Sequence, residues 1–147
     1  MEFMMHFNFL AARTRGAVLA TVLAVAMAGS TASARPALNE EQHINDSLVS
    51  AAVGELIRRK CSTISVNYFV ALGKAHALKR YALGLGYSRP EIEAFLEDKD
   101  EQKRVRRSAN SYLKTNGVVK GNEATYCTLG RTEIANRSLT GQLIWAR

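Results

Sequence analysis

The sequence predicts an all-α fold, a compact bundle of four or five short helices with one disulfide, preceded by a cleavable signal peptide. After residue 34, apolar residues recur every three to four positions, as they do along one side of an α-helix, and no strand-like alternation of useful length is found. The chain has only two cysteines, Cys61 and Cys127. Its first part also has the three-part organisation of an export signal.

The predicted signal peptide occupies residues 1–34. Two arginines give it a charged beginning, residues 17–27 are apolar apart from one threonine, and small residues in an A-x-A pattern lead to a cleavage site between Ala34 and Arg35. The apolar stretch is shorter than the roughly 20 residues that a membrane-spanning helix needs. We therefore expect a protein located outside the cytoplasm, with no transmembrane span after processing. An uncleaved anchor is the alternative interpretation.

Residues 35–147 have the length of a single small helical domain. The whole chain has 20 Lys and Arg residues and 13 Asp and Glu residues, and removal of the signal peptide leaves 18 and 12, a balance of +6. In the cytoplasm this charge would indicate nucleic-acid binding, but outside it the abundant polyanions are lipid head groups and envelope polymers. We therefore expect an unknown protein or an anionic envelope component as the partner, and neither nucleic acid nor a cofactor. The oligomeric state is left open.

The two cysteines predict a disulfide. An even number of cysteines in an oxidising compartment is typical of paired cysteines, and here only one pairing is possible. The bond between Cys61 and Cys127 would close a long loop and contribute about 4 kcal/mol on the loop-entropy model. The alternatives are a catalytic thiol and a zinc site that uses His43 and His76, although no C-x-x-C spacing supports them.

The first helix is predicted to begin after Asn39 as its N-cap, with Glu40 and Glu41 in the first turn, and to end near Lys60. Acidic side chains at the start of a helix interact favourably with its dipole. The apolar stripe of this helix repeats every four residues, at Ile44, Leu48, Ala52 and Leu56.

The second helix is predicted to start at Ser65 and to end before Gly86, which we expect in the left-handed conformation. Its apolar arc extends over more than half of the circumference and includes Tyr68, which indicates the central helix of the bundle. His76 lies at the margin of this arc, so a partly buried structural role is expected. The alternative is a proton-transfer role in a small periplasmic enzyme, together with a nearby carboxylate.

A capping box of Ser88 and Glu91 predicts the start of a third helix. Asp98 and Glu101 repeat this spacing and predict the start of a fourth, which residues 116–117, Asn-Gly, would end.

The densest run of charge lies within that fourth helix. Because successive helical residues are about 100° apart, we expect its cations to spread around the helix, with only Val105 turned inward. One interpretation is a solvated helix face, and the other is a contact surface for an anionic partner. No aromatic residues interleave the run, so a base-stacking surface is not expected. The residues of this candidate surface are Lys103, Arg104, Arg106 and Arg107.

Asn122 is the predicted start of the last helix. A glycine in the middle of a helix costs about 1 kcal/mol relative to alanine, so Gly130 predicts the close approach of another backbone. We expect this helix to pack near the turn at Cys61. The C-terminal tail is apolar, and Trp145 is the expected anchor of its packing.

Three short motifs occur together: Lys-Cys at residues 60–61, Leu-Gly-Tyr-Ser at 85–88 followed by Glu-Ile at 91–92, and Cys-Thr-Leu-Gly-Arg at 127–131 followed by Glu-Ile-Ala at 133–135. In this combination the chain resembles a family of small uncharacterised exported proteins of alphaproteobacteria, classified as a domain of unknown function. The resemblance implies a Gram-negative exported protein and a cysteine pair typical of the group. It implies no activity and no catalytic residue. We therefore expect a non-enzymatic periplasmic binding module with a basic surface, and the alternative is a small enzyme that uses His76.

Overall fold

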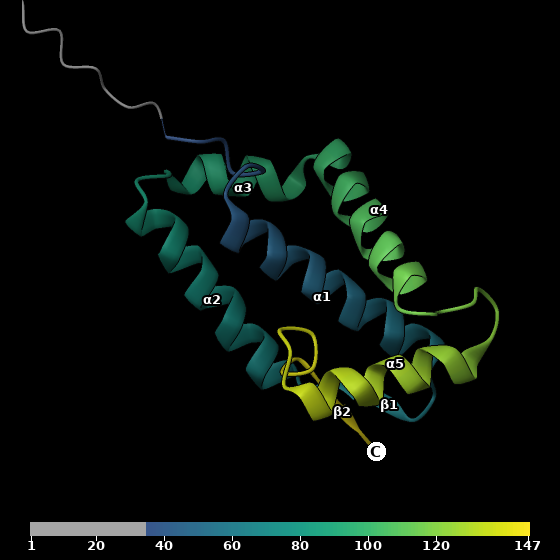
Figure 1. The fold of residues 1–147 in the computed structure, drawn as a ribbon. Coiled ribbons are helices and arrows are strands. Elements are labelled where there is room, and N and C mark those ends of the chain that lie inside the picture. The colour runs from purple at the N-terminus through teal and green to yellow at the C-terminus, as the bar shows by residue number, and fades with distance from the viewer. Residues whose placement is uncertain (1–34) are drawn as a thin grey trace, which may run out of the picture. The chain divides into compact units, whose positions relative to one another are not determined.

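The computed structural model describes residues 35–147, so the predicted signal peptide, with Ala34 at its end, lies outside the described residues. The structure confirms a helical bundle with one disulfide and adds two short strands that we did not expect (Figure 1). The helices are α1 (Gln42–Lys60), α2 (Tyr68–Gly84), α3 (Arg89–Glu97), α4 (Lys99–Thr115) and α5 (Glu123–Asn136), and the strands are β1 (Ile64–Val66) and β2 (Ile144–Ala146).

The central helix is α1, which contacts α2, α4 and α5 and lies between α2 and α4 in Figure 1. Our expectation that α2 is central is therefore wrong. In α2 only Ala82 is buried, and Phe69 is 91% exposed. The apolar arc of α2 contains many alanines, and small side chains of this kind bury little apolar area, so its width does not determine the position of the helix.

Two predicted helix starts are shifted along the chain. The N-cap of α1 is Glu41 instead of Asn39, and its carboxylate accepts a hydrogen bond from the backbone N–H of Ile44 at 2.9 Å. The N-cap of α2 is Asn67, because Ser65 belongs to β1. In both cases an oxygen-bearing side chain two residues further on replaces the expected cap.

The two strands pair in antiparallel fashion, with Ile64 opposite Ala146 and Val66 opposite Ile144. Neighbouring side chains of a strand point to opposite faces, and here Ile144 is buried whereas Trp145 is 48% exposed. The expected anchoring role of Trp145 is therefore wrong, and Ile144 anchors the tail. Strands of three residues are too short for the alternation to be recognised in the sequence.

The main core lies among α1, α4, α5 and the two strands, and the disulfide between Cys61 and Cys127 belongs to it. Gly130 of α5 faces this core. A Cβ atom added at Gly130 would lie 2.2 Å from Cδ1 of Ile64 and 2.8 Å from Cγ2 of Ile57. The predicted docking of α5 near Cys61 is confirmed, but side chains make the close approach instead of backbone.

A smaller cluster joins the first turns of α1 to α2 and α3, with Ile44, Ala82, Tyr87 and Ile92 buried together. The predicted capping box is confirmed at the start of α3. Gly86, just before it, has a φ of 89°, the left-handed conformation expected for it.

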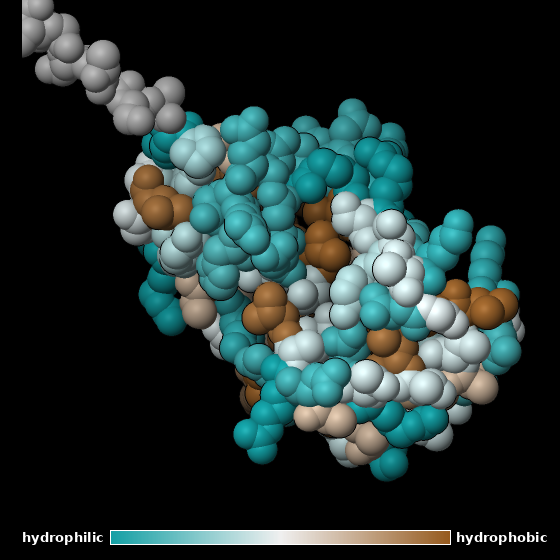
Figure 2. Space-filling view, viewed as in Figure 1, coloured by the Kyte–Doolittle hydropathy of each residue, from teal (hydrophilic) through white to brown (hydrophobic). Residues whose placement is uncertain are grey.

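The face shown in Figure 2 is mostly hydrophilic, and apolar side chains reach it only in separate small patches. Among residues 35–147, no helix combines the length and the apolar content needed to cross a membrane.

Candidate functional site

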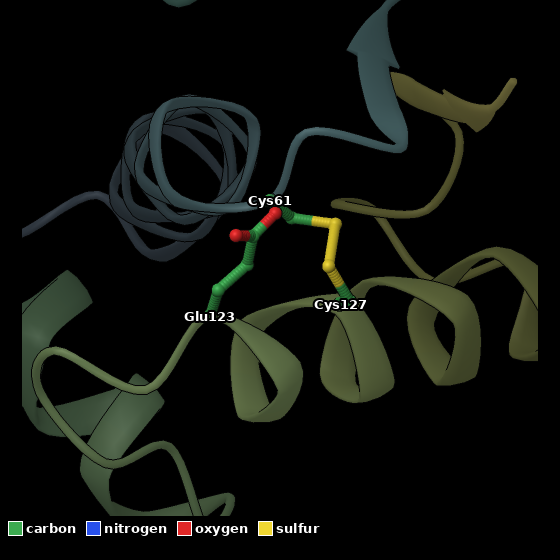
Figure 3. A group of neighbouring side chains, drawn as sticks. All are labelled: Cys61, Glu123 and Cys127. Atoms are coloured by element: carbon green, nitrogen blue, oxygen red, sulfur yellow. A yellow bond between two sulfur atoms is a disulfide. The ribbon is translucent and has the colours of Figure 1, made fainter.

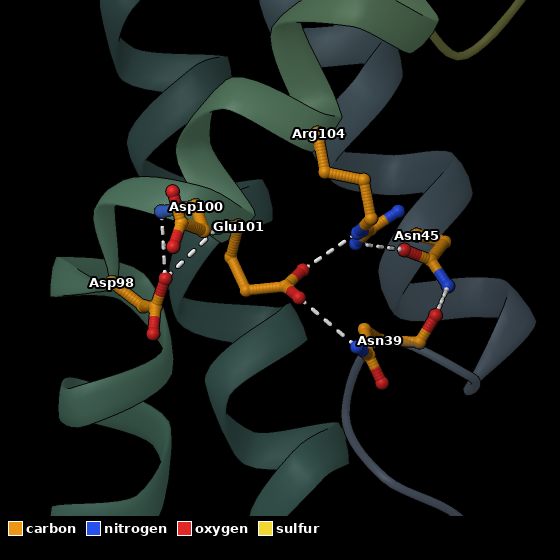
Figure 4. A network of polar contacts seen from close by, with 6 residues as sticks. All are labelled: Asn39, Asn45, Asp98, Asp100, Glu101 and Arg104. Carbon is orange, nitrogen blue, oxygen red and sulfur yellow. Dashed lines mark hydrogen bonds and ion pairs between the residues drawn. The ribbon is translucent and has the colours of Figure 1, made fainter.

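The four cations of the predicted surface all lie on α4, but they do not act as one surface. Arg104 turns toward α1 (Figure 4). Its Nε is 2.6 Å from a carboxylate oxygen of Glu101 on the same helix, and its NH2 group donates to Oδ1 of Asn45 on α1 at 2.7 Å. The expectation that only Val105 turns inward is therefore wrong. The reason is the carboxylate three residues earlier on the helix, together with an amide on the facing helix.

Figure 4 shows that Arg104 belongs to a network that joins the start of α1 to α4. Glu101 also accepts a hydrogen bond from Nδ2 of Asn39 at 3.0 Å, and the Asn45 side chain donates to the backbone carbonyl of Asn39. Asp98 caps α4 by accepting from the N–H groups of Asp100 and Glu101. These contacts hold Arg104 within the fold, where it links α4 to α1, although 30% of its side chain remains exposed.

The other three cations of the run point outward. Lys103 forms an ion pair of 3.0 Å with Asp100, and both side chains are largely exposed. Such exposed pairs are worth little. Arg106 and Arg107 are exposed, and within residues 35–147 neither has a carboxylate within ion-pair distance.

Arg106 lies on the edge of a groove that we call the α1–α4 groove, which has a volume of about 310 Å³. Its floor is apolar and comes from α1, α3 and α4. Its rim carries Arg59 of α1 and Arg106 of α4. The floor residues are Leu48, Ala52, Leu56, Phe95, Leu96 and Val105.

The acidic groups beside this groove are already paired. Glu55 accepts two hydrogen bonds of 2.8 Å from Arg58 and one of 2.6 Å from Arg59. The hydrogen bond from Arg58, assisted by Arg59, lowers the pKa of Glu55 to about 2 against the opposing effect of burial. Glu101 is paired with Arg104. The lining thus carries two acidic and two basic residues, and Arg106 is its one cation without a carboxylate within ion-pair distance among residues 35–147.

The histidines give no support to a catalytic or metal site. His76 is exposed on α2, so the expected partial burial is wrong, and within residues 35–147 it has no hydrogen bond or ion pair with a carboxylate. His43 packs edge-on against the ring of Tyr81, with the centroids 4.7 Å apart. A zinc site that combines these histidines with the cysteines is not formed, because the two sulfurs are bonded to each other.

A carboxylate lies beside the disulfide. Cys61, Cys127 and a carboxylate oxygen of Glu123 have their potential ligand atoms within 4.8 Å of one another (Figure 3). The Glu123 carboxylate accepts the backbone N–H of Ser62 at 2.8 Å, and the Ser62 hydroxyl together with this N–H lowers the pKa of Glu123. Since disulfide sulfurs are not thiolates, this group fastens the start of α5 to the turn after α1 and does not form a metal site.

One polar site was not predicted from the sequence. Glu133 of α5 is only 5% exposed and lies in a groove among α1, α4 and α5. The Tyr112 hydroxyl donates to one of its oxygens at 2.5 Å, and the Ser138 hydroxyl donates to the other. The available signal was the position of Glu133 on the same side of the helix as Gly130, which faces the core. A carboxylate on such a face requires polar partners.

The sequence model of DUF5333, a family of unknown function, matches residues 36–145. This range covers the described domain apart from its ends. The chain belongs to DUF5333. No curated protein and no solved structure matches it. The match fits an uncharacterised family, and membership in DUF5333 assigns no activity to the α1–α4 groove or to Glu133.

Proposed function

We propose that this DUF5333 protein is a non-enzymatic binding module of the periplasm that holds an acidic, amphipathic segment of a partner protein in the α1–α4 groove. An amphipathic helix binds in this way when its apolar face lies in a groove between helices. Charges at the rim of such a groove select the partner and raise the association rate. The apolar floor together with Arg106 on the rim supports this mode of binding, whereas Arg59 is paired with Glu55.

The unpaired charge of Arg106 is the observation on which the proposal rests. Its guanidinium group is exposed at the groove and has no acidic partner among residues 35–147. A guanidinium group binds a carboxylate through two parallel hydrogen bonds, which gives direction as well as attraction. Lys103 and Arg107 add longer-range attraction, whereas Arg104 is satisfied inside the fold.

Export is part of the same proposal. The pattern of residues 1–34 supports it, and so does the disulfide, because disulfides persist in oxidising compartments. The test is to sequence the N-terminus of the protein recovered from the periplasmic fraction. We expect Arg35 as the first residue. Recovery of the chain in the cytosolic fraction with Met1 intact would contradict export.

Binding is tested with two designed helical peptides that share an apolar face of leucines and differ only in flanking glutamates or lysines. The Arg106→Glu variant is compared with Arg107→Glu, a matched control one residue away that does not line the groove. We expect Arg106→Glu to weaken binding of the acidic peptide by about tenfold, the effect of losing one charge-assisted hydrogen-bonded contact. Arg107→Glu should have a much smaller effect, measured by fluorescence anisotropy at moderate salt.

Two results would contradict the proposal. Equal losses in both variants would mean that the attraction is spread over α4 and that the groove does not bind the peptide. Equal affinity for the acidic and the basic peptide would remove the role of the rim charges. Circular dichroism of each variant shows whether the fold is retained, which we expect because both side chains are exposed.

A further inference from the structure

A second groove lies between α1 and α2, next to the α1–α4 groove with which it shares Leu48, and Leu139 and Leu143 of the C-terminal segment also line it. We call it the α1–α2 slot. Its volume is about 310 Å³, within the range of small-molecule sites. The lining consists mainly of alanine and leucine, with two serines, one histidine and one lysine as its polar residues. Its main apolar residues are Ala51, Ala71, Ala75, Leu78, Leu139 and Leu143.

The slot exists because α2 is fastened at both ends and touches little in between. Near its start, the Asn67 N–H donates to the carbonyl of Leu143 at 2.8 Å, which ties α2 to the C-terminal segment (Figure 1). Near its end, the Tyr81 hydroxyl donates to Glu41 at 2.9 Å, and the Tyr81 ring packs against His43. Between these attachments, alanine methyl groups do not fill the space between the helices, whereas protein interiors are close-packed.

The charges at the slot have one sign. Lys74 lines it, and none of its lining residues is acidic. The Lys74 ammonium donates to the neutral Oε1 of Gln142 at 2.7 Å and has no carboxylate within ion-pair distance among residues 35–147. Its charge is therefore not compensated within the fold, and an anion at the mouth of the slot would compensate it.

The apolar surface continues past the mouth of the slot. Tyr68 and Leu72 are exposed on α2, three or four residues from Ala71 and Ala75 of the lining. Residues at this spacing are neighbours on the surface of a helix. An apolar chain longer than the slot would thus meet further apolar side chains instead of water.

We propose that the α1–α2 slot binds a free fatty carboxylate, with the alkyl chain between the helices and the carboxylate at Lys74. The small apolar lining suits a narrow, flexible chain better than a rigid ring system or a folded peptide. The single uncompensated cation suits a carboxylate head group. This site adjoins the α1–α4 groove through Leu48, but its cation and the rest of its lining differ, so it does not depend on the function proposed there.

The test is titration of protein produced from the full chain with dodecanoate below its micellar concentration, followed by calorimetry. A cationic alkyl ammonium of the same chain length is the matched probe. We expect dodecanoate to bind about tenfold more tightly than the ammonium, because only the carboxylate forms a charge-assisted hydrogen bond with Lys74. Chemical-shift changes should be largest at the methyl groups of Ala51 and Ala75.

Two variants test the cation and the apolar lining of the slot separately, and a third serves as a control. Lys74→Glu should weaken dodecanoate binding by about tenfold, whereas Arg80→Glu, an exposed charge on α2 outside the slot, should change it little. Ala75→Leu should also weaken binding because it fills the slot. All three positions are exposed, so the fold should be retained, and circular dichroism checks this.

The proposal is overturned if dodecanoate and the ammonium bind equally well, if Ala75→Leu has no effect, or if the shift changes map elsewhere. It is also overturned if another occupant covers the slot. A dimer that Ala75→Leu dissociates would assign the slot to a second copy of the chain. A full chain that binds dodecanoate only after removal of residues 1–34 would assign it to the chain's own N-terminal segment.

Discussion

The two sides of α1 differ in how closely the neighbouring helices pack. On the side of α4 and α5, Ile57 and Ala109 have no exposed surface, and the disulfide and the strand pair belong to the same cluster. On the side of α2, a 17-residue helix buries Ala82 alone. An added Cβ at Gly73 of α2 would meet no atom within 4 Å.

This difference shows that apolar composition alone does not decide which helix is buried. Helix α2 is more apolar than α5, yet α5 buries five residues. What distinguishes α5 is its close fit, since Gly130 lets the side chains of Ile57 and Ile64 reach the helix backbone. We infer that the buried cluster on the side of α4 and α5 supplies most of the stability, although grooves also open on that side, while α2 contributes little buried surface.

The largest effect should come from removal of the disulfide on the tightly packed side. A chain carrying Cys61→Ala together with Cys127→Ala should lose about 4 kcal/mol of the free energy of unfolding, because the crosslink restricts a long loop of the unfolded chain. The measurement is urea unfolding. Wild-type protein unfolded with a thiol reductant is the control and should agree with the double variant. An unchanged midpoint in both would contradict the prediction.

The next largest effect should come from Gly141→Ala, also on the tightly packed side. The added Cβ would lie 1.9 Å from the carbonyl oxygen and 2.3 Å from the carbonyl carbon of Glu133. These are backbone atoms at the end of α5, so they cannot rotate away as a side chain can. Overpacking of this kind costs about 1–3 kcal/mol or more. Urea unfolding of the variant measures it, and a loss below that range would mean that the C-terminal segment shifts freely.

The elements that the sequence predicted well are those specified by neighbouring residues. The capping box of Ser88 and Glu91, the start of α4 at Asp98 and the start of α5 at Asn122 are all confirmed. In each case a side chain satisfies N–H groups within three residues of itself, so the signal is local.

The predictions that failed depend on contacts between distant residues. Arg104 turns inward because Asn45, on another helix, accepts its hydrogen bond. Trp145 is half exposed because Ile64 and Val66 fix the register of the strand pair, which directs Ile144 inward. No local pattern contains this information.

The candidate sites, like the fold, were predictable only where the signal is local. Arg106 was found from the density of charge, but the groove beside it requires α1 and α3 to be in place. Glu133 was missed because its partners, Tyr112 and Ser138, come from α4 and from the segment after α5. The α1–α2 slot results from an imperfect fit between two helices, which periodicity does not reveal.

A smaller effect is expected at Tyr112, which supports the buried Glu133. The hydrogen bond to Glu133 raises the pKa of Tyr112 from 10 to about 12. Because the folded state favours the protonated phenol, its contribution to stability should be complete below pH 10 and lost as the pH rises through about 12. Ultraviolet absorbance of the phenolate should show a late-titrating component that shrinks in Tyr112→Phe, while Tyr81, whose pKa is also raised by its hydrogen bond to Glu41, continues to contribute.

The same variant should cost about 1 kcal/mol at neutral pH, since the Glu133 carboxylate keeps only the donor from Ser138. The cost is moderate because Tyr112 is 38% exposed and water can partly replace its hydroxyl. If all tyrosines titrate together, the hydrogen bond between Tyr112 and Glu133 is not formed in solution.

The smallest effect has the opposite sign and completes the comparison of the two sides. Gly73→Ala in α2 should raise the free energy of unfolding by about 0.5–1 kcal/mol, because alanine has the higher helix propensity and the site is open. The same substitution thus stabilises the protein on the side of α2 and destabilises it at Gly141. Urea unfolding of both variants under identical conditions measures the contrast. A loss of stability in Gly73→Ala would mean that α2 packs against something in solution, and the side of α2 would then be no more open than the side of α5.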